Sequence, residues 1–252
     1  MSGGLLELRE LRKNFGGVVA TNDVSLRFEP GTLSAIIGPN GAGKTTLFHL
    51  ITGKLPVSGG EVLLDGAAIT GLDRTEIVRR GIGRAFQVAN LFPSFTVRDA
   101  LAAALMAHAG RTASLARSFP PRDVAARADE VMELCGLAPL AGTESRHLSH
   151  GDQKLLDIAL ALALDPKVLL LDEPTAGMGP DERWRMIERV HGLWLARGLT
   201  LVFIEHDMDI VFKISQSVRV LRYGAVLAEG TPDEIRRNPA VIEAYLGEEH
   251  AL

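Results

Sequence analysis

A glycine-rich segment between an apolar run and a helical pattern constrains the fold of this chain most strongly. Residues 38–46 read GPNGAGKTT, which fits G-x-x-x-x-G-K-[ST]; LSAIIG precedes the segment and KTTLFHLITG follows it. Glycines let backbone N–H groups converge on phosphate oxygens, and the start of the helix adds partial positive charge. A flexible glycine turn is the alternative, but the strand–loop–helix order favours a phosphate loop. Its predicted residues are Gly38, Pro39, Asn40, Gly41, Ala42, Gly43, Lys44, Thr45 and Thr46.

Two acidic residues supply the chemistry that such a loop needs. Within the loop, Lys44 places a positive charge for the β- and γ-phosphates, and Thr45 offers a hydroxyl to Mg²⁺. In VLLLDEP, residues 168–174, Asp172 ends an apolar run where it can hold Mg²⁺ directly or through water. Glu173 follows, positioned to orient and polarise an attacking water. Alone, the two acids could simply end a strand, but with the phosphate loop they predict hydrolysis of a nucleoside triphosphate.

The order of apolar patterns predicts an α/β fold. The runs KVLLLDEP and LTLVFIEH flank an amphipathic pattern at 180–197, as expected for parallel strands covered on both faces. Strand patterns also stand at 5–11, 24–29, 33–38 and 61–66, helical patterns at 96–109, 121–137 and 151–164, and two strands with a turn at Gly224 within 218–230. The sequence therefore predicts an α/β core interrupted by a helical insertion.

Composition excludes several classes of protein. The net charge of −4 over 252 residues does not suggest the strongly basic face of a nucleic-acid binder, so we expect no nucleic-acid partner. The lone Cys135 lies among apolar residues and is expected to be a buried small hydrophobe, which excludes disulfides. No secretory signal is evident, and the apolar runs are far shorter than the roughly 18 residues that span a bilayer. We expect a soluble chain that docks on another protein if it works at a membrane.

The segment LSHGDQK, residues 148–154, has three interpretations. Ser149, His150 and Asp152 could be a nucleophilic triad, but neighbours on one helical turn diverge instead of converging. Ser149 is also a good N-cap, with Asp152 in the first turn. A helix with such a start, facing outward, is itself an anion site. The last two interpretations are compatible.

Five motifs in fixed order resemble the nucleotide-binding subunit of ATP-binding-cassette (ABC) transporters. They are the phosphate loop, Gln87, LSHGDQ, LLLDEP and His206, and the resemblance runs from Phe15 to the C-terminus. The segment LSHGDQ is similar to the signature sequence Leu-Ser-Gly-Gly-Gln, with His150 for the first Gly and Asp152 before Gln153. The resemblance implies a P-loop NTPase (RecA-like) core with an antiparallel β subdomain, in 1–87 and 160–230. It also implies an inserted α-helical subdomain in 88–159 and a tail in 231–252, all in one ABC ATPase domain.

The resemblance also assigns roles to single residues. Phe15 would stack on adenine, although a core Phe is the plain alternative. Gln87 would touch Mg²⁺ or water and link the core to the helical subdomain, or else be an exposed loop residue. His206 would contact the γ-phosphate, or else cap a strand end. Ser149, Gly151 and Gln153 would bind the nucleotide held by a second ATPase subunit, either the same chain or a sister chain, so that two ATP sites form in a head-to-tail dimer.

Partners and substrate follow from the resemblance alone. It implies two separate membrane permease subunits. A short permease helix would dock in a groove lined by Leu91, Phe92 and Phe95; alternatively, these side chains belong to the core of the helical subdomain. The ending AEGTPDEIRRNPAVIEAYLGEE is similar to that of ATP-binding subunits of branched-chain amino-acid importers. This resemblance implies a subunit on the cytoplasmic face of the membrane and, indirectly, a periplasmic binding protein as a partner. Urea or amide importers, a lipopolysaccharide exporter branch and a non-transport ABC ATPase stay open. Gly179 replaces the usual Asp of the loop after Glu173, and Asp181 is expected to begin the next helix behind Pro180.

Overall fold

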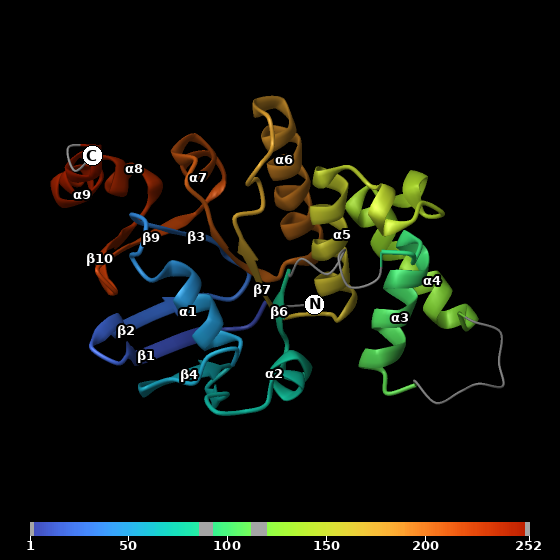
Figure 1. The fold of residues 1–252 in the computed structure, drawn as a ribbon, viewed down its shortest axis with the longest axis horizontal. Helices are drawn as coiled ribbons and strands as arrows, with labels where there is room; N and C mark the ends of the chain where they lie inside the picture. The colour runs from blue at the N-terminus through green and yellow to red at the C-terminus, as the bar shows by residue number, and fades with distance from the viewer. Residues whose placement is uncertain (1–2, 86–92, 112–119, 250–252) are drawn as a thin grey trace.

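The computed structural model describes residues 3–85, 93–111 and 120–249, and within them the centre is a six-stranded sheet (Figure 1). The strand order is β10-β9-β3-β8-β7-β6. All neighbours pair in parallel except β10, which is antiparallel to β9. The strands are β3 Leu33–Ile37, β6 Ile82–Arg84, β7 Val168–Asp172, β8 Thr200–Ile204, β9 Ser217–Arg222 and β10 Ala225–Gly230.

The three central strands bring the predicted site loops to one edge of this sheet. Strands β3 and β8 are buried throughout, and β7 is buried up to Asp172. In the register, Phe203 of β8 lies opposite Ala35 of β3 and Leu171 of β7, so the three strands end side by side. Ligands of open parallel sheets bind at the carboxyl ends of the strands. The phosphate loop, Glu173 and His206 all follow those ends.

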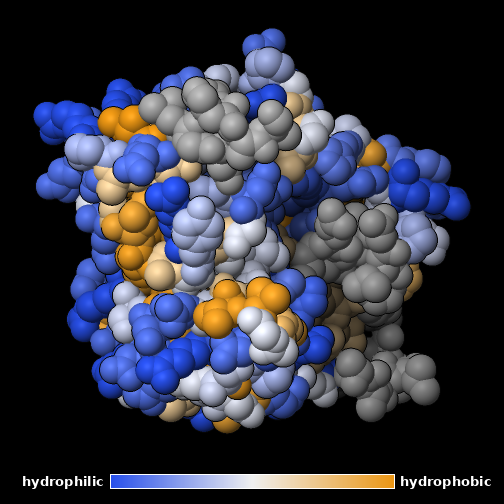
Figure 2. Space-filling model, turned by 60° about the vertical axis from the view of Figure 1, so that its left-hand side comes forward, coloured by the Kyte–Doolittle hydropathy of each residue, from blue (hydrophilic) through white to orange (hydrophobic). Residues whose placement is uncertain are grey.

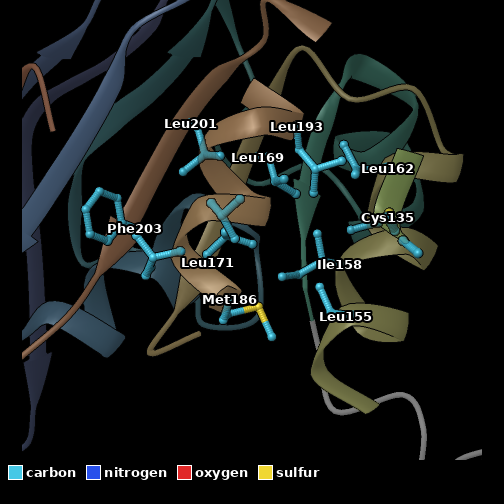
Figure 3. Packing of buried hydrophobic residues seen from close by; sticks show 14 of the residues in the cluster. Cys135, Leu155, Ile158, Leu162, Leu169, Leu171, Met186, Leu193, Leu201 and Phe203 are labelled. Atoms are coloured by element: carbon cyan, nitrogen blue, oxygen red, sulfur yellow. The ribbon is translucent and has the colours of Figure 1, made fainter. Parts of the chain in front are cut away.

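Long helices cover one face of the central sheet, and a helix with a second sheet covers the other, as the apolar runs predicted for strands covered on both faces. Side chains of β7 and β8 face those of α5 (His150–Ala163) and α6 (Pro180–Arg197) in Figure 3. Helices α3 (Val97–His108) and α4 (Arg122–Cys135) continue this layer. Cys135 is buried at its edge, and burial raises the pKa of its thiol to about 12, so the expectation of an unreactive core cysteine is confirmed.

A smaller antiparallel sheet covers the other side of the molecule. Its order is β2-β1-β4-β5, and helix α1 (Lys44–Ile51) lies between it and the central sheet. Leu47 and Phe48 of α1 are fully buried in the core that the two sheets share. The bounds of these strands are β1 Leu6–Phe15, β2 Val18–Phe28, β4 Gly59–Leu64 and β5 Ala67–Ala68.

The sequence patterns did not predict the short helices. They are α2 (Arg74–Arg80), α7 (Met208–Ile214), α8 (Pro232–Arg236) and α9 (Pro239–Glu249). Three of them begin at capping side chains: Asp73, Asp207 and Thr231, the last in a capping box with Glu234. Among the helices of the described ranges, none is both long enough and apolar enough to cross a bilayer.

Candidate active site

The phosphate loop follows β3 and has a backbone that requires glycine at two positions. Gly38 has φ 148° and Gly43 has φ 98°. A Cβ at Gly38 would lie 2.1 Å from the carbonyl oxygen of Leu221, and one at Gly43 would lie 2.5 Å from that of Ala20. Gly43 is the N-cap of α1 and has no side chain to cap it. The first N–H groups of α1 are therefore not taken by a cap side chain and can bind an anion.

Lys44 extends back into the loop instead of into solvent. Its ammonium donates to the carbonyl oxygens of Gly38 at 2.6 Å and Pro39 at 2.9 Å, and the residue is buried. Thr45, the next residue, is exposed. The loop thus has a positive charge at its centre and a hydroxyl at its rim, which matches the predicted roles in phosphate and Mg²⁺ binding.

Asp172 ends β7 beside a cation that the sequence reasoning missed. Arg84 of β6 donates to Asp172 Oδ2 at 2.7 Å, and both side chains are largely buried. Burial raises the pKa of the Asp172 carboxyl above its ordinary value, and Arg84 opposes this rise. Arg84 directly follows Ile82 and Gly83 on a three-residue strand, which is too short for a periodic signal. The oxygen donors of Asp172 and Thr45 are those that Mg²⁺ prefers, and α1 packs against β7.

Glu173 and His206 form a hydrogen-bonded pair at the ends of β7 and β8. Glu173 Oε1 lies 2.8 Å from His206 Nε2, and both side chains are partly exposed. Glu173 has φ 50°, an uncommon value for a residue with a side chain, and its N–H donates to Ile204. This backbone turns the carboxylate away from the strand direction and toward the histidine.

Glu205 is a second residue that the sequence reasoning passed over. It is buried, and its Oε1 accepts hydrogen bonds from the N–H and the hydroxyl of Thr175, at 3.0 and 2.6 Å. Its Oε2 accepts from the N–H of His206 at 3.2 Å. The Glu205 side chain therefore links the backbone at His206 to Thr175, in the loop that follows Glu173. The sequence signal that could have identified Glu205 is a carboxylate at the end of the apolar run LTLVFIEH.

The segment at Ser149 is a capped helix start and not a triad. The Ser149 hydroxyl accepts from the N–H of Asp152 at 3.1 Å and donates to its carboxylate at 2.7 Å. The His150 ring lies 3.3 Å from the carbonyl oxygen of Ala176, away from both. The amide of Gln153 donates to the carbonyls of Ser145 and Leu148 in its own chain. A Cβ at Gly151 would lie 2.4 Å from Glu182 Oε1, the end of a flexible side chain that would have to move.

The remaining predicted residues divide into three groups. Phe15 is 47% exposed at the end of β1, so the core-Phe alternative is wrong and the side chain is accessible to a base. Figure 2 shows a mainly hydrophilic face on which hydrophobic side chains gather in limited patches. Gln87, Leu91 and Phe92 lie outside the described residues. Phe95 packs against the core, and Asp181 lies in the first turn of α6 behind Pro180, as expected.

Comparison with known proteins agrees with this geometry. Residues 21–176 match the family described as "ABC transporter", and residues 225–251 match "Branched-chain amino acid ATP-binding cassette transporter". The chain is 39% identical over 256 residues to the high-affinity branched-chain amino acid transport ATP-binding protein LivG of Escherichia coli K12, covering 98% of this chain and 100% of LivG. It is 40% identical over 254 residues to BraF of Pseudomonas aeruginosa, with the same coverage of each chain.

Solved structures of similar sequence share the fold. A nucleotide-free ATP-binding cassette from an ABC transporter matches with TM-score 0.85 and 31% identity, over 96% of this chain and 98% of that one. An ATP-binding cassette in its ADP conformation also matches with TM-score 0.85 and 31% identity, over 97% and 99% of the two chains. The α/β P-loop fold of the ABC ATPase type is confirmed. The chain belongs to the ABC transporter family, as a nucleotide-binding cassette whose C-terminal segment is of the branched-chain amino acid type.

Proposed function

We propose that this chain is the ATP-hydrolysing subunit of a transporter that imports branched-chain amino acids. The observation that carries the proposal is the Glu173–His206 pair, with its 2.8 Å contact, at the strand ends next to the phosphate loop. A carboxylate held by a histidine beside a bound triphosphate can orient a water for attack on the γ-phosphorus. The bond from that phosphorus to the bridging oxygen then breaks, and ADP and phosphate leave.

The chain's own residues divide the work of this reaction. Lys44 exchanges its loop carbonyls for phosphate oxygens, and the N–H groups at the start of α1 hold the β-phosphate. Glu173 accepts the proton of the attacking water, and His206 keeps the carboxylate in place. Thr45 and Asp172 would hold Mg²⁺, with Gln87 a further proposed ligand. Mg²⁺ supplies neutralisation of the charge on the β- and γ-phosphates when bound.

Each ATP is proposed to lie between two cassettes. In Figure 1, α1 with its phosphate loop lies on one side of β7, and α5 lies on the other side. Ser149, Gly151 and Gln153 at the start of α5 are therefore assigned to the nucleotide of a second cassette, of the same or a sister chain. A head-to-tail pair completes two such sites by one symmetry operation. The subdomain limits given above, with 88–159 as the helical part, belong to this proposal.

An apolar groove of about 270 Å³ suits the permease contact. Its walls come from α2, β6, α3 and α5, and alanines of α3 make up much of one side: Ala100, Ala103, Ala104 and Ala107. Small side chains allow close approach of a helix, which is how an amphipathic partner helix docks. Phe95 packs against the core, so we assign the permease contact to this groove instead of to Phe95. We place the subunit at the cytoplasmic face of two permease chains, where ATP is available.

The substrate assignment depends on the named relatives. LivG and BraF are named for branched-chain amino acid transport, and the C-terminal segment at 225–251 is of that type. Urea, amide and lipopolysaccharide transport gain no such support, nor does a role outside transport. The transported molecule meets the permease and a periplasmic binding protein, so the cassette's residues do not select it.

The test is Glu173→Gln in the purified chain. We expect ATP hydrolysis to fall by about 10²–10⁴-fold, while a fluorescent ATP analogue binds as before and a dimer accumulates. Glu188→Gln, a change at an exposed glutamate of α6, is the matched control and keeps the full rate. A Glu173→Gln protein that hydrolyses ATP normally would remove Glu173 from its assigned role.

A further inference from the structure

Two side chains on one face of α5 contact the loop that follows β7. His150 lies 3.3 Å from the carbonyl oxygen of Ala176, and Lys154 Nζ donates to the carbonyl oxygen of Glu173 at 2.7 Å. Residues four apart on a helix project in the same direction, so the two contacts act as a pair. The same helix begins at Ser149, which the proposed function assigns to the partner's nucleotide.

The contact of Lys154 holds a backbone that would otherwise relax. Glu173 has φ 50°, a conformation that costs of order 1 kcal/mol or more for a residue with a side chain. Such a conformation persists where surrounding contacts fix it. Lys154 fixes the carbonyl side of the Glu173 peptide, and the N–H of Glu173 donates to Ile204. The direction of the Glu173 carboxylate therefore depends on α5.

The Lys154 ammonium is half-buried and surrounded by carboxylates, which restricts its position. Burial lowers the pKa of its ammonium, and the nearby carboxylates of Glu205, Glu173, Asp157 and Asp172 oppose the decrease. A half-buried ammonium near four carboxylates gains from a fixed geometry. It also adjoins a small pocket of about 70 Å³ with Asp172 and Pro174 on its wall.

The loop itself is shaped to receive the His150 ring. Gly177 has φ 81°, and a Cβ there would lie 3.2 Å from His150 Nε2. On the opposite side, Thr175 of the same loop is held by the buried carboxylate of Glu205. The loop is thus fixed from α5 on one side and from the end of β8 on the other.

We propose that His150 and Lys154 are positioning residues that couple the two ATP sites of a dimer through one protomer. When the start of α5 engages the partner's γ-phosphate, a rigid helix carries any displacement to Lys154, one turn away. Lys154 passes the displacement to Glu173, which acts on the nucleotide of its own protomer. This route bypasses position 179, where a glycine stands in place of the usual aspartate.

The inference rests on the proposed function and predicts a separation of kinetic constants. In Lys154→Met, kcat should fall about 10- to 100-fold, the effect expected for the loss of a charge-assisted hydrogen bond, while KM for ATP changes less than about threefold. The Hill coefficient for ATP should fall toward 1. Lys154→Arg should recover most of kcat, because its guanidinium can donate to the same carbonyl.

His150→Ala should lower kcat and the Hill coefficient in the same direction, and the double variant should lose less than the product of the two single losses. Lys167→Met is the control, since Lys167 pairs with Asp65 on the surface away from the site. Thermal unfolding of each variant separates positioning from loss of fold. Unchanged kcat and cooperativity in folded Lys154→Met would overturn the inference alone. Absence of ATP hydrolysis in the wild-type protein would overturn the proposed function and the inference together.

Discussion

Replacement of Arg84 by methionine tests the electrostatics of the site more directly than any change at the nucleotide. The Arg84 and Asp172 side chains are 7% and 19% exposed, and a 2.7 Å hydrogen bond joins them. Methionine keeps much of the volume of arginine and removes its charge. Asp172 is then left largely buried without the guanidinium that opposes the rise of its pKa.

The size of the loss follows from this burial. Removal of one partner of a buried ion pair costs about 3–5 kcal/mol. Because Asp172 keeps some solvent contact and can take up a proton, we expect about 2–4 kcal/mol for Arg84→Met. For a chain of this length, that loss lowers Tm by about 5–15 °C. The further change Asp172→Asn removes the uncompensated charge and should recover about half of the loss.

The measurement is a thermal and urea unfolding series on four proteins: wild type, Arg84→Met, Asp172→Asn and the double variant. The deficit of Arg84→Met should be smaller at pH 5 than at pH 8. Burial raises the folded-state pKa of Asp172, so lower pH protonates the carboxyl and relieves the buried charge. A deficit below about 1 kcal/mol, or a double variant less stable than Arg84→Met, would refute the reasoning.

Three further predictions follow from other parts of the site. Gly43→Ala should abolish binding of a fluorescent ATP analogue in a chain that still folds, because its Cβ would meet the Ala20 carbonyl at 2.5 Å; normal binding would contradict this. Ser149→Ala should slow hydrolysis at the partner's site in mixed dimers, and damage confined to its own site would refute the assignment. Burial, Arg84 and Lys54 lower the pKa of His49 to about 4, so it contributes stability above pH 6.5 that is lost as pH falls toward 4; His49→Gln should flatten that part of the unfolding profile.

The long buried elements could be predicted from sequence because each shows its burial as a local pattern of apolar residues along the chain. Strands β3, β7 and β8 are continuous apolar runs, and α6 carries an unbroken amphipathic pattern within the predicted limits of 180–197. Strand ends in a parallel sheet share an edge, so the runs that end at Glu173 and His206 place both residues at one edge, but their hydrogen bond was not predicted. The capped start of α5 at Ser149 was predicted for a similar local reason.

The features that escaped prediction are those that depend on contacts between distant segments. Strand β6 has three residues, and its Arg84 reaches Asp172 across 88 positions of sequence. Glu205 gains its role from Thr175, on a different loop. In the sequence, Lys154 is an ordinary polar position on α5, and only the structure shows its hydrogen bond to the carbonyl of Glu173. A single sequence does not say which distant residue each of these side chains will contact.

The groups expected to meet nucleotide are already hydrogen-bonded within their own chain. Lys44 donates to loop carbonyls, Glu173 contacts His206, and Ser149 shares two hydrogen bonds with Asp152. Binding of ATP therefore exchanges hydrogen bonds instead of adding them, and each exchange yields a small net free energy. A small gain at one group cannot hold two protomers together, because association carries its own entropic cost. In the proposed dimer, closure must then draw on many such exchanges at two sites at once.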